Sequence, residues 1–239
     1  MMIVKPIKTT LFREREDITT FLLRFIRKPK EKSIVVVTSK IIALSEGRTV
    51  KIGSAKEKEK LIKKESDVSI STKYVQMTLR DGMAMPSAGI DESNADGKYI
   101  LLPKDSFKTA KLIKEKLQRK YHVKNLGVLI TDSRTLPLRS GVIGVALGYA
   151  GFSGVKDYIG KRDLFGRKFK FSSVNIADSL ATAAVLTMGE GNEQQPIAVI
   201  EEAPVEFREK VYSEELKIAV KNDIYVNFFS KLSKYKKYK

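Results

Sequence analysis

Short oxygen-bearing side chains gather at a glycine turn in a chain that is otherwise rich in lysine. In MPSAGIDESN, residues 85–94, Asp91 and Asn94 stand three apart, with an acid and a serine between them. Carboxylate, hydroxyl and amide oxygens are the groups that bind a hard divalent cation and the phosphates it carries. The alternative is an Asx-turn, in which Asp91 and Asn94 only satisfy their own backbone. The spacing alone favours this alternative, because such turns are common.

A second group of this kind lies in TDSRTLPLRSG, residues 131–141. Asp132 comes directly after a strongly apolar run, where we expect a strand to end, and Ser133 adds a hydroxyl. An acid at the carboxyl end of a strand lies at the sheet edge where ligands commonly bind. Arg134 and Arg139 supply guanidinium groups suited to carboxylate or phosphate. A polar turn with two surface arginines is the alternative, but two Asp-plus-hydroxyl turns make a shared metal site more credible than either alone.

The glycine-rich stretch 141–167 is the third candidate. It carries seven glycines but no GK[ST] sequence, so it is not a Walker A loop. Close backbone packing or intertwining of subunits explains the glycines as well as contact with phosphate does. Asp157 and Asp163 lie toward its end, where they could be catalytic, although charge pairing within a turn is the commoner arrangement.

The fourth candidate is MGEGNEQQP, residues 188–196, between an expected helix and an expected strand. Gly189 and Gly191 allow a tight backbone path, and Glu190 is placed to meet a cation. The alternative is an ordinary connection in which glycine ends the helix.

The amino-acid composition excludes several kinds of catalytic and metal site. The chain has no cysteine, which excludes disulfides, thiolate metal sites and a cysteine nucleophile. His122 is the single histidine and lies in a basic run, which argues against a Ser-His-Asp triad and against a histidine-rich metal site. Any metal should therefore have oxygen ligands, as Mg²⁺ and Mn²⁺ prefer. The sequence shows neither an apolar run near 20 residues nor a signal-peptide core, so we expect a cytoplasmic protein.

The formal net charge of +17 suggests an anionic partner. Nucleic acid is one possibility, but the lysines are dispersed, often among glutamates, and no RNA-recognition signature is present. A polyanionic small molecule would be attracted equally well. We therefore predict a small anionic substrate, with a basic nucleic-acid-binding protein as the alternative.

Helical and strand patterns are mixed without regular βαβ alternation, which predicts an α+β fold with irregular mixed sheets and packed helices. Hydrophobic periodicity and cap residues indicate four helices. They begin near Asp17, Ser54, Asp105 and Asn175. Apolar runs predict four strands. These are residues 33–38, 99–102, 126–131 and 197–200.

Six blocks taken together resemble a known family. They are SKIIALSEGR (39–48), AGIDESN (88–94), LITDS (129–133), GVALGYAGF (144–152), DYIGKRDLFGR (157–167) and NIADSLATAAVLTMGEG (175–191). In this order they resemble the coenzyme F420-0:L-glutamate ligases, the γ-glutamyl ligases of deazaflavin cofactor synthesis. The resemblance implies a ligase-like domain over residues 1–207. Residues 208–239 would form a C-terminal extension, and we expect its last nine residues to be a frayed basic tail because five of them are lysines.

The resemblance also implies an intertwined homodimer that uses GTP and Mg²⁺ or Mn²⁺ to join L-glutamate to a carboxylate through an acyl phosphate. Carried over by motif, Asp91 and Asp132 would hold one metal ion and Ser133 a second, with Glu190 a further metal contact. The nucleotide site would comprise Ser39, Lys40, Asn94 and the loop 188–194, including Gly189 and Gly191.

Two roles come from the chemistry that this resemblance implies. Arg139, together with Lys40, would hold phosphates or the carboxylates of glutamate. Asp157 or Asp163 would take the proton that the attacking amine loses.

The stretch 131–139 departs from the family pattern. The family reads TDT, then a Gly-Arg pair and an aromatic-Arg pair, whereas this chain reads TDSRTLPLR. Serine keeps the hydroxyl, but loss of the glycine and the aromatic residue changes the wall beside the metal. A subgroup with a similar stretch resembles proposed folate-type γ-glutamate ligases, so the acceptor is either a coenzyme F420 precursor or a pteroate or folate.

Overall fold

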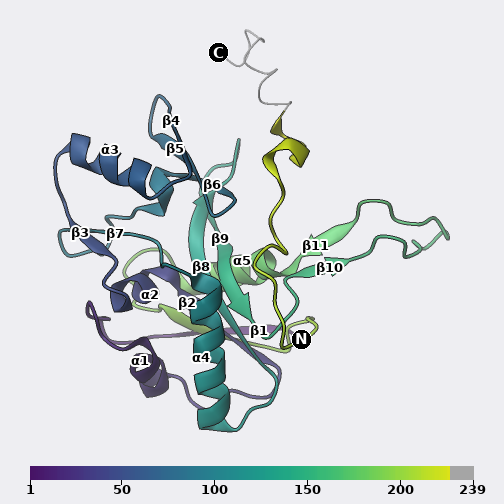
Figure 1. Cartoon of the computed structure of the whole chain (residues 1–239). Coiled ribbons are helices and arrows are strands. Elements are labelled where there is room, and N and C mark those ends of the chain that lie inside the picture. Colours follow the sequence, from purple (N-terminus) through teal and green to yellow (C-terminus); the bar gives the residue numbers. More distant parts are fainter. Residues whose placement is uncertain (227–239) are drawn as a thin grey trace.

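The computed structural model describes residues 1–226 of the chain, and a five-stranded mixed sheet forms its centre (Figure 1). In spatial order its strands are β1 (Ile3–Ile7), β12 (Ile197–Glu201), β2 (Ser33–Thr38), β8 (Leu126–Thr135) and β9 (Val142–Ala150). Only the β2–β8 pair within this sheet is parallel. This topology confirms the predicted α+β class with mixed sheets.

Helices cover both faces of the sheet, which explains the uninterrupted apolar sequence of β2. Val35 and Val37 belong to the core cluster that includes residues of α1 (Ile18–Phe25) and α4 (Ser106–Tyr121). Ile34 and Val36 belong to the opposite cluster with α5 (Ile176–Met188). Because alternate side chains point to opposite faces, a strand covered on both faces needs an apolar residue at every position.

The predicted helix starts are confirmed by their caps. The Asp17 side chain accepts from the Thr20 backbone N–H at 2.7 Å, and Asp105 accepts from that of Lys108 at 2.8 Å. Ser54 and Glu57 form a capping box at the start of α3 (Ala55–Lys64). Each side chain satisfies a backbone donor that the first helical turn leaves without a partner.

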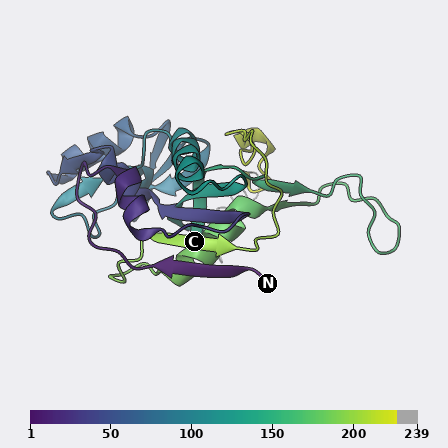
Figure 2. The same ribbon diagram turned by 90° about the horizontal axis from the view of Figure 1, so that it is seen from below.

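Several short elements surround the sheet. They are α2 (Ser39–Ser45), the ribbon of β3 (Thr49–Lys51) and β7 (Lys98–Ile100), the sheet of β4 (Val68–Ser71), β5 (Gln76–Arg80) and β6 (Met83–Pro86), and the 3₁₀ turns η1 (Ser87–Gly89) and η2 (Val220–Asn222). Strands β10 (Val155–Asp157) and β11 (Ser173–Asn175) form a hairpin whose loop projects far from the body, and we call residues 155–175 the arm (Figures 1 and 2). Among residues 1–226, no helix combines the length and apolar character needed to cross a membrane.

The C-terminal segment 203–217 packs against the sheet and the base of the arm. The Glu215 carboxylate accepts from the Tyr149 hydroxyl at 2.6 Å and the Gly154 backbone N–H at 3.0 Å, and it pairs with Arg208 at 2.5 Å. Burial disfavours the ionised carboxylate, but these hydrogen bonds and the ion pair outweigh it and hold the pKa of Glu215 below its usual value. The last nine residues, predicted to fray, lie outside the described part.

Two glycines of β9 let helices approach the sheet. A Cβ on Gly144 would lie 2.3 Å from the backbone oxygen of Ala181 in α5, and one on Gly148 would lie 2.5 Å from the backbone of Phe107 in α4. Close backbone packing is therefore the role of these glycines, as one of the two interpretations of the glycine-rich stretch proposed.

We expect Gly148→Ala to lower the free energy of unfolding by about 1–3 kcal/mol, because the new methyl group meets helix backbone that cannot move alone. Chemical denaturation would measure the loss. Gly53→Ala is the control, because the atoms nearest to its new Cβ belong to the flexible side chain of exposed Glu57. Equal stability of the Gly148→Ala variant and the unsubstituted protein would contradict the packing role.

Candidate functional site

The parallel register of β2 and β8 brings two of the predicted residues together. Thr38 and Thr131 are paired across the two strands, so Ser39 at the start of α2 lies beside Asp132 of β8. There the Ser39 hydroxyl donates to Oδ1 of Asp132 at 2.9 Å. The predicted turn after Thr131 is wrong, because residues 131–135 continue β8 by pairing with residues 142–146 of β9.

The Asp91 loop reaches the same place through Lys40. Its backbone is fixed by two hydrogen bonds with Ile100, of 3.0 and 2.8 Å. The Lys40 ammonium lies 2.7 Å from Oδ2 of Asp91 and donates to Ser93 Oγ at 2.9 Å. Because Ser39 and Lys40 are neighbours in the chain, the Asp91 loop and Asp132 of β8 converge on one short segment. A shared site requires this arrangement, and metal binding by the two aspartates stays a prediction.

Asp91 also makes the turn that the alternative interpretation predicted. The Ser93 backbone N–H donates to Oδ1 of Asp91 at 2.7 Å, and the Ser93 hydroxyl to Oδ2 at 3.0 Å. Burial disfavours its ionised form, but Lys40 and Ser93 outweigh this effect and hold the pKa of Asp91 below its usual value. The carboxylate is therefore charged at neutral pH and already oriented.

The loop after α5 completes the cluster. The Ser133 hydroxyl donates to Oε1 of Glu190 at 2.5 Å, and the Asn94 side-chain amide donates to the Gly191 carbonyl oxygen at 3.1 Å. Gly189 ends α5 with a φ of 82°, a conformation that favours glycine. The structure thus brings Glu190 and Gly191 to the predicted site, and Gly189 serves as the helix C-cap that the alternative interpretation named.

The sequence indicated that the Arg134 guanidinium suits a carboxylate or phosphate, and the structure pairs it with a carboxylate. Its side chain is 8% exposed, pairs with Oδ2 of Asp132, and donates to the Ser133 carbonyl oxygen at 2.8 Å. Its Nε is buried without a hydrogen-bond partner among the described residues. A strand predicted to continue through TDSRT would have placed Arg134 beside Asp132, because residues i and i+2 share a strand face.

Strand alternation also separates Asp132 from Ser133. Asp132 contacts Ser39 beside α2, whereas Ser133 contacts Glu190 after α5. Adjacent residues of a strand point to opposite faces, so these two side chains would contact different ions. In residues 1–226, no group of three or more His, Cys, Asp or Glu side chains is placed to hold a metal ion.

Three predicted catalytic residues lie outside the cluster in this single chain. Arg139 is exposed in the loop between β8 and β9, where its backbone N–H bonds to Leu136. In the arm, Asp157 accepts from the Ile159 backbone N–H, and Asp163 accepts from those of Phe165 and Arg167. Both aspartates therefore stabilise their own turns through backbone amides, rather than through the charge pairing that was the alternative expectation.

Comparison with known proteins assigns most of the chain to the family that the six sequence blocks resemble. Residues 6–202 match the model of the family described as F420-0:Gamma-glutamyl ligase. A Methanococcus maripaludis protein named coenzyme F420:L-glutamate ligase is 33% identical over 198 residues, covering 75% of this chain and 79% of that protein. The Methanocaldococcus jannaschii protein of the same name is 32% identical over 196 residues, covering 74% and 78%. The Methanopyrus kandleri protein is 39% identical over 136 residues, covering 56% and 54%.

The chain therefore belongs to the F420-0:gamma-glutamyl ligase family, and its class is that of a glutamate ligase. The family match ends at Glu202, so the boundary predicted at residue 207 stays a prediction.

Proposed function

We propose that this protein joins L-glutamate to a carboxylate of a coenzyme F420 precursor, with GTP and a divalent metal ion. The observation that carries the proposal is the convergence of the Asp91 loop and of Asp132 in β8 on Ser39 and Lys40, in a chain of this family. The matching proteins are named for coenzyme F420 and L-glutamate, which supports this acceptor and this amine.

The residues at the cluster fit Mg²⁺ or Mn²⁺ by their chemistry. Asp91, Asp132, Ser133 and Glu190 offer only oxygen atoms, the ligands these cations prefer. Asp91 and Asp132 would hold one ion, and Ser133 with Glu190 a second, on the other face of β8. A bound divalent ion would neutralise charge on the transferring phosphoryl group.

The remaining residues would position the anions. The acceptor carboxylate oxygen attacks the γ-phosphorus of GTP, giving an acyl phosphate and GDP. The glutamate amine then attacks the acyl carbon, releasing phosphate and one proton. Phosphoryl transfer depends on alignment and on compensation of negative charge. Lys40 is placed for both, because its ammonium is oriented by Oδ2 of Asp91 and by the carbonyl and hydroxyl oxygens of Ser93, all within 2.9 Å. Asn94 would orient the nucleotide beside the Gly191 backbone.

A homodimer would bring the arm to a second copy of the chain. Leu164, Phe165 and Phe171 are 99%, 95% and 90% exposed in the single chain. Large apolar side chains gathered on one projecting loop are typical of a surface that a partner covers. In such a dimer, Asp163 or Asp157 would act as the base at the partner's site. Arg139 would contact an anion at that site.

The activity test is direct. We expect the protein, incubated with GTP, Mg²⁺, L-glutamate and a deazaflavin carrying a lactyl phosphodiester, to yield a product heavier by one glutamyl residue in mass spectrometry. Native mass spectrometry of the same sample should show two chains per particle.

Dihydropteroate is the second acceptor to test, because the TDSRTLPLR stretch resembles the folate-type subgroup. Product with dihydropteroate alone would reassign the acceptor. A protein that binds no GTP and modifies neither acceptor would overturn the proposed function, and a single-chain mass would overturn the dimer.

A further inference from the structure

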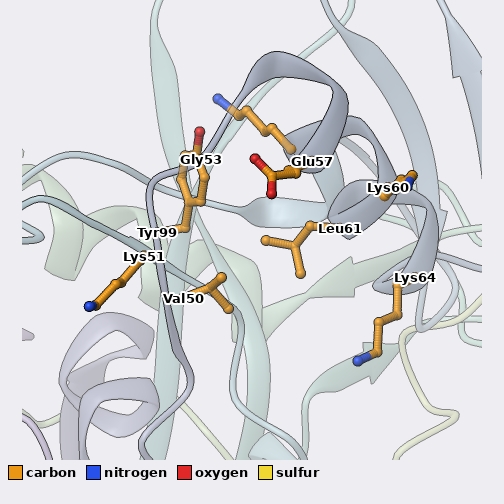
Figure 3. A pocket seen from close by; sticks show the side chains of 9 residues that line it. Val50, Lys51, Gly53, Glu57, Lys60, Leu61, Lys64 and Tyr99 are labelled. Carbon is orange, nitrogen blue, oxygen red and sulfur yellow. The ribbon is translucent and has the colours of Figure 1, made fainter.

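A basic pocket lies next to the Asp91 loop, between α3 and the β3–β7 ribbon (Figure 3). Its volume is about 280 Å³, close to the lower end of the range of about 300–1,000 Å³ for small-molecule sites. Four lysines and one glutamate line it together with apolar side chains. The lining residues are Val50, Lys51, Gly53, Glu57, Lys58, Lys60, Leu61, Lys64 and Tyr99.

The positive charge of this pocket is not compensated within it. Glu57 is engaged by the backbone N–H and the hydroxyl of Ser54, both at 2.7 Å. Across the described residues, Lys51, Lys60 and Lys64 form no ion pair, whereas Lys63 on the same helix pairs with Glu59 at 2.7 Å. Lys60 and Lys64 are four residues apart, so they repel each other along the helix. Among the described residues, Lys58 is the one pocket lysine that forms an ion pair, and its partner Glu92 does not line the pocket.

An apolar surface accompanies the charge. Val50 and Tyr99 are paired across the β3–β7 ribbon, and Leu61 faces them from α3 (Figure 3). Such a surface favours a ligand with a ring or a hydrocarbon portion, because a simple inorganic anion would leave this apolar area exposed to water. The pocket therefore suits an organic anion with both an apolar body and at least two negative groups.

The pocket is connected to the candidate site by two contacts. The Lys58 ammonium pairs with Glu92, the residue after Asp91, and lies 5.2 Å from the centre of the Tyr99 ring. Tyr99 precedes Ile100, whose backbone pairs with that of Asp91. A ligand lying in the pocket would thus extend along β7 toward the two aspartates.

We propose that this pocket binds the acceptor of the ligase, an organic anion with a ring. The apolar portion lies on Val50 and Leu61, and phosphate or carboxylate groups contact Lys60 and Lys64. This inference rests on the proposed function, in which the acceptor carboxylate must reach the cluster of Asp91 and Asp132. It assigns to α3 a role in recognising the acceptor, separate from the nucleotide residues at Lys40 and Asn94.

The test compares two double variants of α3 that lose the same charge. Lys60→Gln with Lys64→Gln removes pocket lysines, and Lys56→Gln with Lys63→Gln removes lysines that do not line the pocket. Binding of the deazaflavin phosphodiester to the full chain is measured by calorimetry without GTP. Because charge-assisted contacts are lost only in the first variant, we expect its acceptor affinity to fall at least about tenfold. The control should stay within about twofold, because the two lysines that it removes do not line the pocket.

Three other outcomes would overturn the assignment of the pocket to the acceptor. Equal losses in both variants would show a general effect of charge, and a loss of GTP binding instead would assign the pocket to the nucleotide. An unsubstituted chain that does not bind the acceptor overturns the inference. Binding without any glutamate transfer would overturn the proposed function alone, and the same two variants would still test the pocket.

Discussion

Asp132→Asn should reduce the rate of glutamate transfer by on the order of 10²–10³-fold, the effect typical of removing one well-placed electrostatic contact in a transition state. Asparagine has the same shape and can still accept from Ser39, whose hydroxyl lies 2.9 Å from Oδ1 of Asp132. The variant therefore changes mainly the charge at the end of β2 and β8. Single-turnover kinetics with saturating GTP would measure the loss.

Asp96→Asn is the matched control, since it removes the same charge from an exposed residue close to Asp91 in the chain. Combining Asp132→Asn with Asp91→Asn sharpens the test. If both carboxylates act on one ion, the double variant should lose little more activity than either single variant. Fully multiplicative losses would contradict a shared ion, and an active Asp132→Asn enzyme would remove this residue from the mechanism.

Arg134→Met should strengthen Mn²⁺ binding about tenfold or more in the absence of nucleotide. The Arg134 guanidinium is buried against Oδ2 of Asp132, so it competes with a metal ion for the same carboxylate. Two unit charges about 4 Å apart interact by about 4 kcal/mol at an effective dielectric constant of about 20, so even a screened fraction of this repulsion alters cation affinity measurably. The electron paramagnetic resonance signal of free Mn²⁺ reports the binding directly.

Two further variants separate charge from packing at this position. Arg134→Lys keeps the charge and should keep the Mn²⁺ affinity, whereas Arg119→Met removes a remote exposed charge and should change it little. Weaker Mn²⁺ binding by Arg134→Met would show that the guanidinium supports the site by orienting Asp132. Unchanged binding in all three variants would place the metal elsewhere.

Local sequence patterns predicted the helices and strands whose formation depends on residues close together in the chain. The helix from Asp105 was predicted because its cap and its apolar face are both visible in the sequence, and β2 because its residues are uniformly apolar. The short strand β3 carries no such signal, and β7 was predicted with other bounds, as residues 99–102. They are held by pairing between residues about 50 positions apart, as in Val50 with Tyr99.

At the candidate site, too, the sequence indicated the residue types, whereas long-range pairing determined which residues meet. The residue types at Asp91 and Asp132 indicated oxygen chemistry, but only the parallel register of β2 and β8 explains why Ser39 meets Asp132. Arg134 was predicted to contact a carboxylate or phosphate, but not Asp132 in particular, because the polar sequence TDSRT was taken for a turn. Pairing with β9 overrides that local preference, and the strand then places Arg134 on the same face as Asp132.

The contacts of Glu215 mean that the unit recognised by evolutionary comparison is smaller than the unit that folds. The family match ends at Glu202, yet Tyr149 of β9 and Gly154 at the base of the arm depend on a carboxylate thirteen residues further along the chain. A polypeptide cut at the family boundary would leave the Tyr149 hydroxyl without its acceptor and uncover the apolar surface around Phe152, which pairs with Phe207. A shortened chain that is meant to keep this fold should therefore include the C-terminal segment 203–217.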